Sequence, residues 1–144
     1  MKNNPILNVN WVDHYRETAL HTASLNGCVD VVKLLLEQPA ISVNLKNQFG
    51  QTPISFACQH GGVLVVRVLL QDPRVDVTLD DNKGRTPLWR ASNDGEYEVI
   101  EWLIASGKDL MVFCAMIFFN SSQLLPMKPF TSLPLLAGCQ WSYR

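Results

Sequence analysis

The chain has 144 residues, of which 47% are hydrophobic, and this is enough apolar material for one packed core. Twelve basic and thirteen acidic residues give a formal net charge of −1. This balance leaves no broad cationic surface for phosphates and therefore argues against a nucleic-acid partner.

A repeat with a period of about 34 residues dominates the sequence, and this period is typical of helical solenoids. Polar, small and apolar residue types each recur at fixed places in the repeat. The aligned positions include Thr18, Thr52 and Thr86; Ala23, Ala57 and Ala91; Gly27, Gly61 and Gly95; Val31, Val65 and Val99; and Leu35, Leu69 and Leu103. Residues 1–16 fit only the second half of such a unit, so we expect them to form a partial N-terminal repeat.

The first helix of each unit is predicted to begin at its threonine. In TPIS (52–55) and TPLW (86–89), threonine can cap free N–H groups, and proline follows at the first helical position, where its missing N–H costs nothing. The small alanines should let a neighbouring helix approach closely. Gly61 and Gly95 are expected to end the helix, because glycine adopts a left-handed conformation without steric cost.

The second helix of each unit is amphipathic, and an extended segment follows it. In CVDVVKLLLEQ, GVLVVRVLLQD and EYEVIEWLIAS, apolar residues recur at three- and four-residue intervals, which predicts a wide buried stripe. The segments AISVNLK and RVDVTLD alternate apolar and polar residues and lead to Gly50 and Gly84. This pattern predicts a loop that folds back as a hairpin.

The three segments TALHTASLNGCVDVVKLLL, TPISFACQHGGVLVVRVLL and TPLWRASNDGEYEVIEWLI resemble the ankyrin motif, with its TPLH opening and its Gly-x-x-x-Val-Val-x-x-Leu-Leu core. The resemblance covers about residues 5–110. It implies an all-α ankyrin-repeat solenoid of helix–turn–helix units with β-hairpin loops. We expect a partial repeat at 1–16, full repeats at 17–50, 51–84 and 85–110, and a non-repeat apolar tail at 111–144.

Two arginines depart from the ankyrin pattern. Arg16 occupies the turn position that Gly50 and Gly84 hold in the later units, so the first hairpin is expected to be strained or differently shaped. Arg90 replaces an apolar residue of the first helix in its unit. Its side chain could extend outward to solvent, or it could mark a repeat whose neighbour is missing.

After Leu110 the repeat register is lost, and three interpretations of the tail remain open. The tail could be an atypical last element that covers repeat three, or a poorly ordered product of altered splicing or a shifted reading frame. A membrane anchor at 110–125 is the third. The apolar run from Leu110 to Phe119 is short of the about 20 residues that a spanning helix needs, which argues against the anchor.

The sequence predicts no enzyme, no cofactor and no metal site. Cys58 and His60 lie two residues apart, which places them on different faces of a helix, and no Gly-rich phosphate loop is present. Trp89 and Trp102 are predicted to lie in the core or to pack between repeats. The carboxylates expected on the solvated surface are Asp80, Asp81, Glu96, Glu98 and Glu101.

Targeting signals and cysteines give the expected compartment. The N-terminus lacks the charged-then-apolar run of a secretory signal. The four cysteines are scattered rather than closely paired, which suits a reducing environment with free, mostly buried thiols. We therefore expect a cytoplasmic or nuclear protein.

The ankyrin resemblance also implies a binding mode, in which a partner protein lies across the concave face and contacts hairpin tips and first helices. The predicted role is a protein–protein interaction module, which could be an adaptor, a scaffold or a competitive inhibitor, with no small-molecule substrate. The alternatives are a membrane-tethered scaffold and a truncated repeat fragment without retained function. The candidate partner-binding residues are Asp13, His14, Tyr15, Glu17, Leu25, Asn26, Gln48, Phe49, Gln51, Gln59, His60, Asn82, Lys83, Arg85, Asn93 and Asp94.

Overall fold

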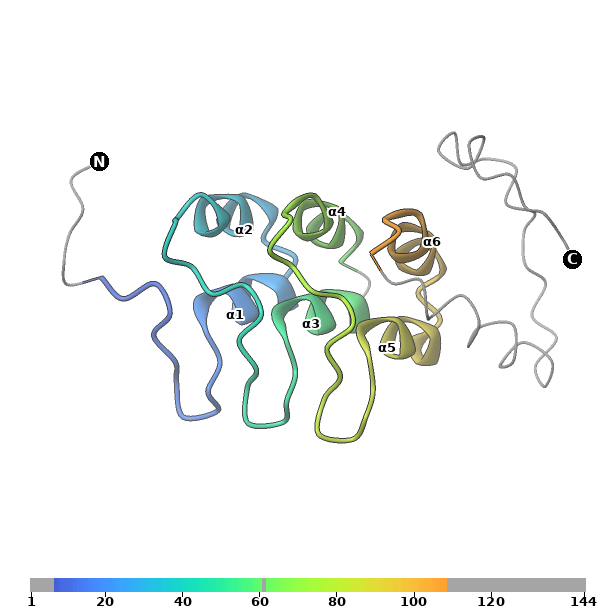
Figure 1. The fold of residues 1–144 in the computed structure, drawn as a ribbon, viewed down its shortest axis with the longest axis horizontal. Helices are drawn as coiled ribbons and strands as arrows, with labels where there is room; N and C mark the ends of the chain where they lie inside the picture. The colour runs from blue at the N-terminus through green and yellow to red at the C-terminus, as the bar shows by residue number, and fades with distance from the viewer. Residues whose placement is uncertain (1–6, 61, 109–144) are drawn as a thin grey trace, which may run out of the picture.

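The computed structural model describes residues 7–60 and 62–108, and within these ranges the chain forms three pairs of antiparallel α-helices (Figure 1). One layer contains the first helix of each pair and the other layer contains the second. The helices are α1 (Ala19–Leu25), α2 (Val29–Leu36), α3 (Pro53–Gln59), α4 (Val63–Gln71), α5 (Pro87–Asp94) and α6 (Tyr97–Ala105). The predicted all-α repeat fold is confirmed.

The apolar tail at 111–144 lies outside the described residues, and so does the candidate anchor segment at 110–125. Of the helices in 7–60 and 62–108, none has the length and apolarity needed to cross a membrane.

The predicted helix starts are confirmed, although one threonine caps differently from the other two. The Thr18 hydroxyl accepts the N–H of His21 at 3.4 Å, and the Thr86 hydroxyl accepts the N–H of Trp89 at 3.2 Å. The Thr52 hydroxyl instead pairs with the Ser55 hydroxyl at 3.0 Å. Gly95 ends α5 in the left-handed conformation, with φ +75°, as predicted. Gly61 lies outside the described residues.

The core lies between the two helix layers and runs through all three pairs. Ala23, Ala57 and Ala91 are buried, so α1, α3 and α5 lie side by side, as their small side chains predicted (Figure 1). Val65 and Val99 are completely buried, but the equivalent Val31 is 45% exposed. Val31 belongs to α2, the first helix of the layer that also contains α4 and α6, and among the described residues no helix of that layer precedes α2 to cover it.

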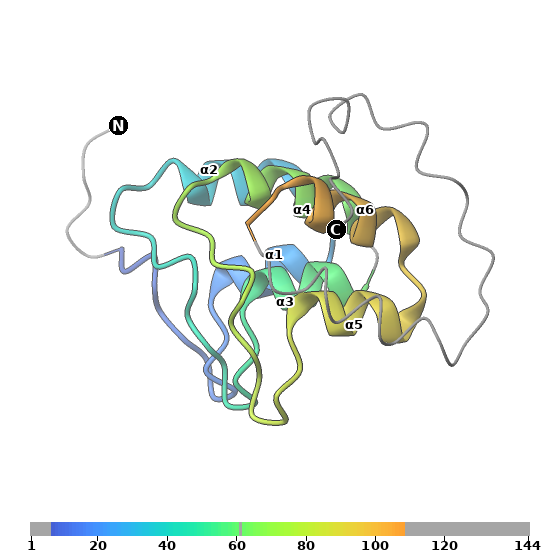
Figure 2. The same ribbon diagram turned by 45° about the vertical axis from the view of Figure 1, so that its right-hand side comes forward.

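Three narrow loops project from the helix layers, and we name them finger 1 (13–17), finger 2 (47–51) and finger 3 (81–85) (Figure 2). Each finger begins with Asp13, Asn47 or Asp81, whose side-chain oxygen accepts the N–H groups two and four residues later at 2.8–3.0 Å. One backbone bond closes each base, from the N–H of residue 13, 47 or 81 to the carbonyl four residues on, at 3.0 Å. No strand is assigned in the described ranges, because each finger is too short for a strand ladder.

The three fingers share a left-handed residue near the tip. Gly50 has φ +77° and Gly84 has φ +71°, and Arg16 adopts the same conformation with φ +62°. The first finger therefore keeps the shape of the others and accepts a strained arginine, which is one of the two outcomes expected from the sequence. A non-glycine residue in this region costs about 1–2 kcal/mol.

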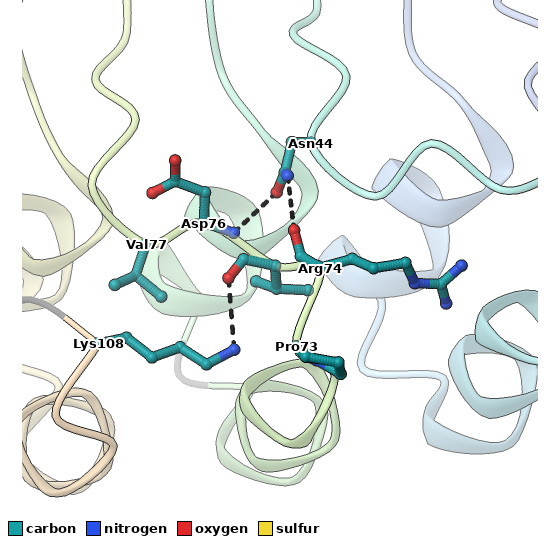
Figure 3. A pocket seen from close by; sticks show the side chains of 7 residues that line it. Asn44, Pro73, Arg74, Asp76, Val77 and Lys108 are labelled. Carbon is teal, nitrogen blue, oxygen red and sulfur yellow. Dashed lines mark hydrogen bonds between the residues drawn. The ribbon is translucent and has the colours of Figure 1, made fainter.

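Polar side chains join the connectors, which are the segments that lead into each finger and, for fingers 2 and 3, follow α2 and α4. The Asn10 side chain bonds the backbone of Ala40 and Ser42, and the Asn44 side chain bonds that of Arg74 and Asp76, at 2.7–2.9 Å (Figure 3). The guanidinium of Arg74 donates to the carbonyl of Leu36 at the end of α2, at 2.8 Å. Lys108 likewise donates to the carbonyls of Asp72 and Val75 after α4. Both cations lie where the helix dipole favours positive charge.

Two glycines with the same φ allow a matched test of the spacing between fingers. A Cβ on Gly50 would lie 2.5 Å from Asn82 Oδ1 and 2.7 Å from its backbone nitrogen, whereas a Cβ on Gly84 meets nothing within 4 Å. We expect Gly84→Ala to cost about 1 kcal/mol of unfolding free energy from strain alone. Gly50→Ala should cost about 1–3 kcal/mol more, because finger 3 must shift. Urea denaturation of both variants measures the difference, and equal losses would show that the fingers are not closely packed.

Candidate protein-binding surface

Hydrogen bonds between neighbouring fingers make the three tips one continuous surface. The N–H of Gln48 donates to the carbonyl of Tyr15, and the N–H of Asn82 donates to the carbonyl of Phe49, both at 3.0 Å. The Asn82 side chain adds a bond to the carbonyl of Gln48 at 3.0 Å. Backbone groups near the tips are therefore fixed, and the side chains that they carry are held at defined positions.

The tips expose large apolar and aromatic side chains that the core does not use. Tyr15 is 47% exposed and Phe49 is 52% exposed, as the sequence predicted for aromatics at turns. The His14 ring lies against the Tyr15 ring, with centroids 4.0 Å apart. Lys83 occupies the equivalent place on finger 3 and is also exposed. Aromatic side chains at such positions are typical anchors of protein interfaces.

The sixteen predicted contact residues divide into exposed and half-buried sets. The exposed ones are His14, Tyr15, Leu25, Asn26, Gln48, Phe49, His60, Asn82, Lys83, Asn93 and Asp94. The half-buried ones are Asp13, Glu17, Gln51, Gln59 and Arg85, and all five hold internal hydrogen bonds. The structure thus brings the finger tips together. The C-terminal ends of α1, α3 and α5 lie at the far end of the layer that these three helices form (Figure 2).

The buried His21 ring joins the start of α1 to finger 2. Its Nδ1 accepts the N–H of Thr18 at 3.1 Å, and its Nε2 therefore carries the hydrogen and donates to the carbonyl of Gln51 at 3.0 Å. His21 thus links α1 to the base of finger 2. Burial lowers the pKa of His21, although the carbonyl of Gln51 and the nearby Glu17 oppose that shift.

Family comparison agrees with this geometry. The family described as "Ankyrin repeats (3 copies)" matches residues 40–114, and the family described as "Ankyrin repeat" matches residues 15–48. The chain belongs to the ankyrin-repeat family. In a comparison with curated proteins, no sequence matches. Ankyrin repeats are in general protein–protein interaction modules.

In this ankyrin array a buried ion pair, which the sequence analysis did not foresee, joins finger 3 to α5. Arg90 and Asp81 are 4% and 6% exposed, and the Arg90 guanidinium lies 2.5 Å from Asp81 Oδ2. The expectation that the Arg90 side chain extends to solvent is wrong, and so is the expectation that Asp81 is solvated. Gln59 accepts from the Arg90 guanidinium and Arg85 pairs with Asp81, so both buried charges have polar partners.

Asp81 has two structural roles, since it also forms the turn of finger 3. Burial by itself raises the pKa of this carboxyl, but the hydrogen bonds from Arg85, Lys83 and Arg90 outweigh burial and lower the pKa. Asp81 therefore stays ionised and keeps Arg90 paired. The one sequence signal was a charged residue at a normally apolar position, and it did not identify Asp81 as the partner of Arg90.

Trp89 is another feature that sequence analysis placed wrongly, because it is 40% exposed rather than packed between repeats. The equivalent residues His21 and Ser55 are buried. The carbonyl of Gln51 in finger 2 accepts a hydrogen bond from the His21 ring. No finger follows Trp89 within the described residues. The guanidinium of Arg85 lies over its ring, 5.4 Å from the centroid. Trp102 is half-buried against the core, as predicted, under Arg67.

The rest of the described structure contains no comparable chemical site. The hollow between the second connector and the end of α6 is lined by Asn44, Asp76 and Lys108, but Asn44 and Lys108 are used to join repeats (Figure 3). Residues 7–60 and 62–108 hold no group of three or more side chains suited to a metal. Burial raises the pKa of the Cys58 thiol, which keeps it protonated. Cys28 is exposed, and Cys114 and Cys139 lie outside the described residues, so the expectation of mostly buried thiols stays a prediction.

The buried pair predicts different outcomes for its two members. Asp81→Ala leaves Arg90 buried without its carboxylate and breaks the finger 3 turn, so we expect a loss of about 3–5 kcal/mol in unfolding free energy. Arg90→Leu restores an apolar residue and leaves Asp81 paired with Arg85, so its cost should be smaller. The exposed Asp80→Ala is the matched control and should cost less than about 1 kcal/mol. A loss at Asp81 no larger than at Asp80 would contradict the pairing.

The lowered pKa of His21 predicts a pH-dependent stability. The unfolded chain binds a proton at His21 near its ordinary value of about 6.5, whereas the folded chain resists protonation. Stability is therefore fully present above that value and is lost as pH falls below it, by up to about 1.4 kcal/mol per pH unit. Thermal or urea unfolding between about pH 7.5 and 5 should show this slope, and His21→Gln should reduce it. Unchanged slopes would assign the acid sensitivity to another group.

Proposed function

We propose that this chain binds another protein through its finger tips and the adjoining face of α1, α3 and α5. The observation that carries the proposal is the exposure of Tyr15 and Phe49 on backbone that neighbouring fingers hold in place. Such side chains lose little further freedom on binding, because their backbone is already ordered. The role would be that of an adaptor, a scaffold or a competitive inhibitor.

The exposed members of the predicted set are the proposed contacts. They vary in type between repeats, whereas the residues that build each finger recur, so the fold does not dictate them. On finger 1 they are His14 and Tyr15, on finger 2 Gln48 and Phe49, and on finger 3 Asn82 and Lys83. The half-buried residues, such as Gln51 and Arg85, support the surface by bonding Arg90 and Asp81.

The free thiol of Cys28 is exposed, which supports a reducing compartment, and the cytoplasm or nucleus is the proposed location. The two alternative functions from the sequence, a membrane-tethered scaffold and a fragment without function, depend on residues 110–144. Those residues lie outside the described part of the chain.

Affinity capture from cell extract with matched full-length baits tests the proposed surface. Tyr15→Ser and Phe49→Ser remove the tip aromatics, and Leu64→Ser removes a side chain of α4 that is 59% exposed away from the fingers. We expect a protein that is retained by the unchanged chain and by Leu64→Ser. Its retention should fall at least about tenfold with the tip variants, because buried aromatic anchors dominate interface energies.

The opposite pattern would reject the surface. If the tip variants retain the same proteins as the unchanged chain, partner binding uses another face. If all baits retain only chaperones, the interpretation as a fragment without function gains support.

A further inference from the structure

Finger 1 carries an arginine where the fold favours glycine. Arg16 has φ +62°, and the equivalent residues of the other fingers are Gly50 and Gly84. Glycine would relieve this strain, since it has no Cβ to crowd the following carbonyl. Backbone strain of this kind is concentrated at functional sites, such as ligand-binding sites. Among the described residues the Arg16 side chain forms no hydrogen bond or ion pair, so the fold itself gains nothing from it.

The acidic side chains of the fingers form internal hydrogen bonds, whereas two of the three basic side chains do not. Asp13 and Asp81 accept backbone N–H groups of their own turns, and Glu17 accepts a bond from Asn47. Asp81 is also neutralised by Arg90. Arg16 and Lys83, by contrast, are both exposed, and no bond to either side chain is present in the described residues. Within the described residues the finger tips therefore expose two cations without an internal partner, Arg16 on finger 1 and Lys83 on finger 3. Phe49 lies on finger 2, between these two fingers, and Tyr15 lies next to Arg16.

We propose that Arg16 and Lys83 are specificity residues that bind two acidic side chains of one extended partner segment, with an apolar side chain of that segment packed on Tyr15 and Phe49. This inference rests on the proposed function, because it names the partner chemistry of the same surface. Exposed cations beside exposed aromatics complement the acidic and apolar side chains of such a segment.

The spacing of the fingers fits an extended segment. Neighbouring packed helices lie about 8–10 Å apart, so the span from finger 1 to finger 3 is about 16–20 Å. An extended peptide advances about 3.3 Å per residue, so five or six residues cover that span. The partner segment is therefore expected to carry acidic residues five or six positions apart, with an apolar residue midway between them. A helical segment advances only about 1.5 Å per residue and would place these side chains too close together.

Selection from a random twelve-residue displayed peptide library on the full chain tests the proposal. Enriched peptides should carry the acidic–apolar–acidic pattern, and their affinities are then measured by fluorescence polarisation. We expect Arg16→Gly and Lys83→Ala each to raise Kd by about tenfold or more, with a weaker salt dependence. Arg16→Lys keeps the charge and the strained backbone, so it should retain part of the affinity. Lys33→Ala, on the exposed face of α2, is the control and should leave Kd unchanged.

Arg16→Gly also separates binding from folding. It removes strain, so its melting temperature should equal or exceed that of the unchanged chain while its affinity falls. If Arg16→Gly binds the peptides as tightly as the unchanged chain, or if the enriched peptides lack paired acids, the assignment is overturned. Loss of binding with Phe49→Ser in that case would still support the proposed function. Binding that is insensitive to Phe49→Ser as well would overturn both.

Discussion

The contact between one repeat and the next is the interaction on which the rest of this molecule depends. Each described helix has only seven to nine residues, and helices shorter than about 12–15 residues do not persist alone in water. They are stabilised by neighbours, as in other repeat arrays. The small Ala57 and Ala91 let α3 and α5 pack closely, and the exposure of Val31 shows what a position loses when no helix covers it.

The same dependence explains how charged groups are tolerated between repeats. Burial of Arg90 would be costly by itself, because an unpaired buried charge loses its hydration. Asp81 offsets that cost from the base of finger 3, while Gln59 contacts the guanidinium from α3. The cluster therefore fixes α5, its own finger and the preceding repeat in one arrangement. Buried pairs of this kind contribute more to the choice of arrangement than to net stability.

Within each finger, some residues form the turn and others expose their side chains to solvent. The first residue of each finger forms the turn, and the backbone near the tip bonds the next finger, as from Gln48 to Tyr15. Apart from Asn82, whose side chain bonds the carbonyl of Gln48, the tip side chains form no internal hydrogen bond in the described residues. Aromatic and cationic groups can therefore be exposed there without loss of the fold. Within 7–60 and 62–108, Arg16 is the non-glycine residue with a left-handed backbone, and this strain is the observation on which its proposed binding role rests.

The amino-acid sequence by itself determined the repeat, the helix pairs, the glycine and threonine positions at helix ends and the exposure of Tyr15 and Phe49. These features follow from local rules, namely periodicity, capping and left-handed turns, that act within one repeat and recur at fixed spacing. Only the tertiary structure decided the fate of Arg90, Asp81 and Trp89. Their burial depends on whether side chains from a neighbouring repeat reach them, as Gln59 reaches Arg90 but no described finger reaches Trp89. The backbone contacts between fingers recur from one repeat to the next, but the contacts of these three side chains each occur once. They leave no period in the sequence, and this is the physical reason that local patterns could not predict them.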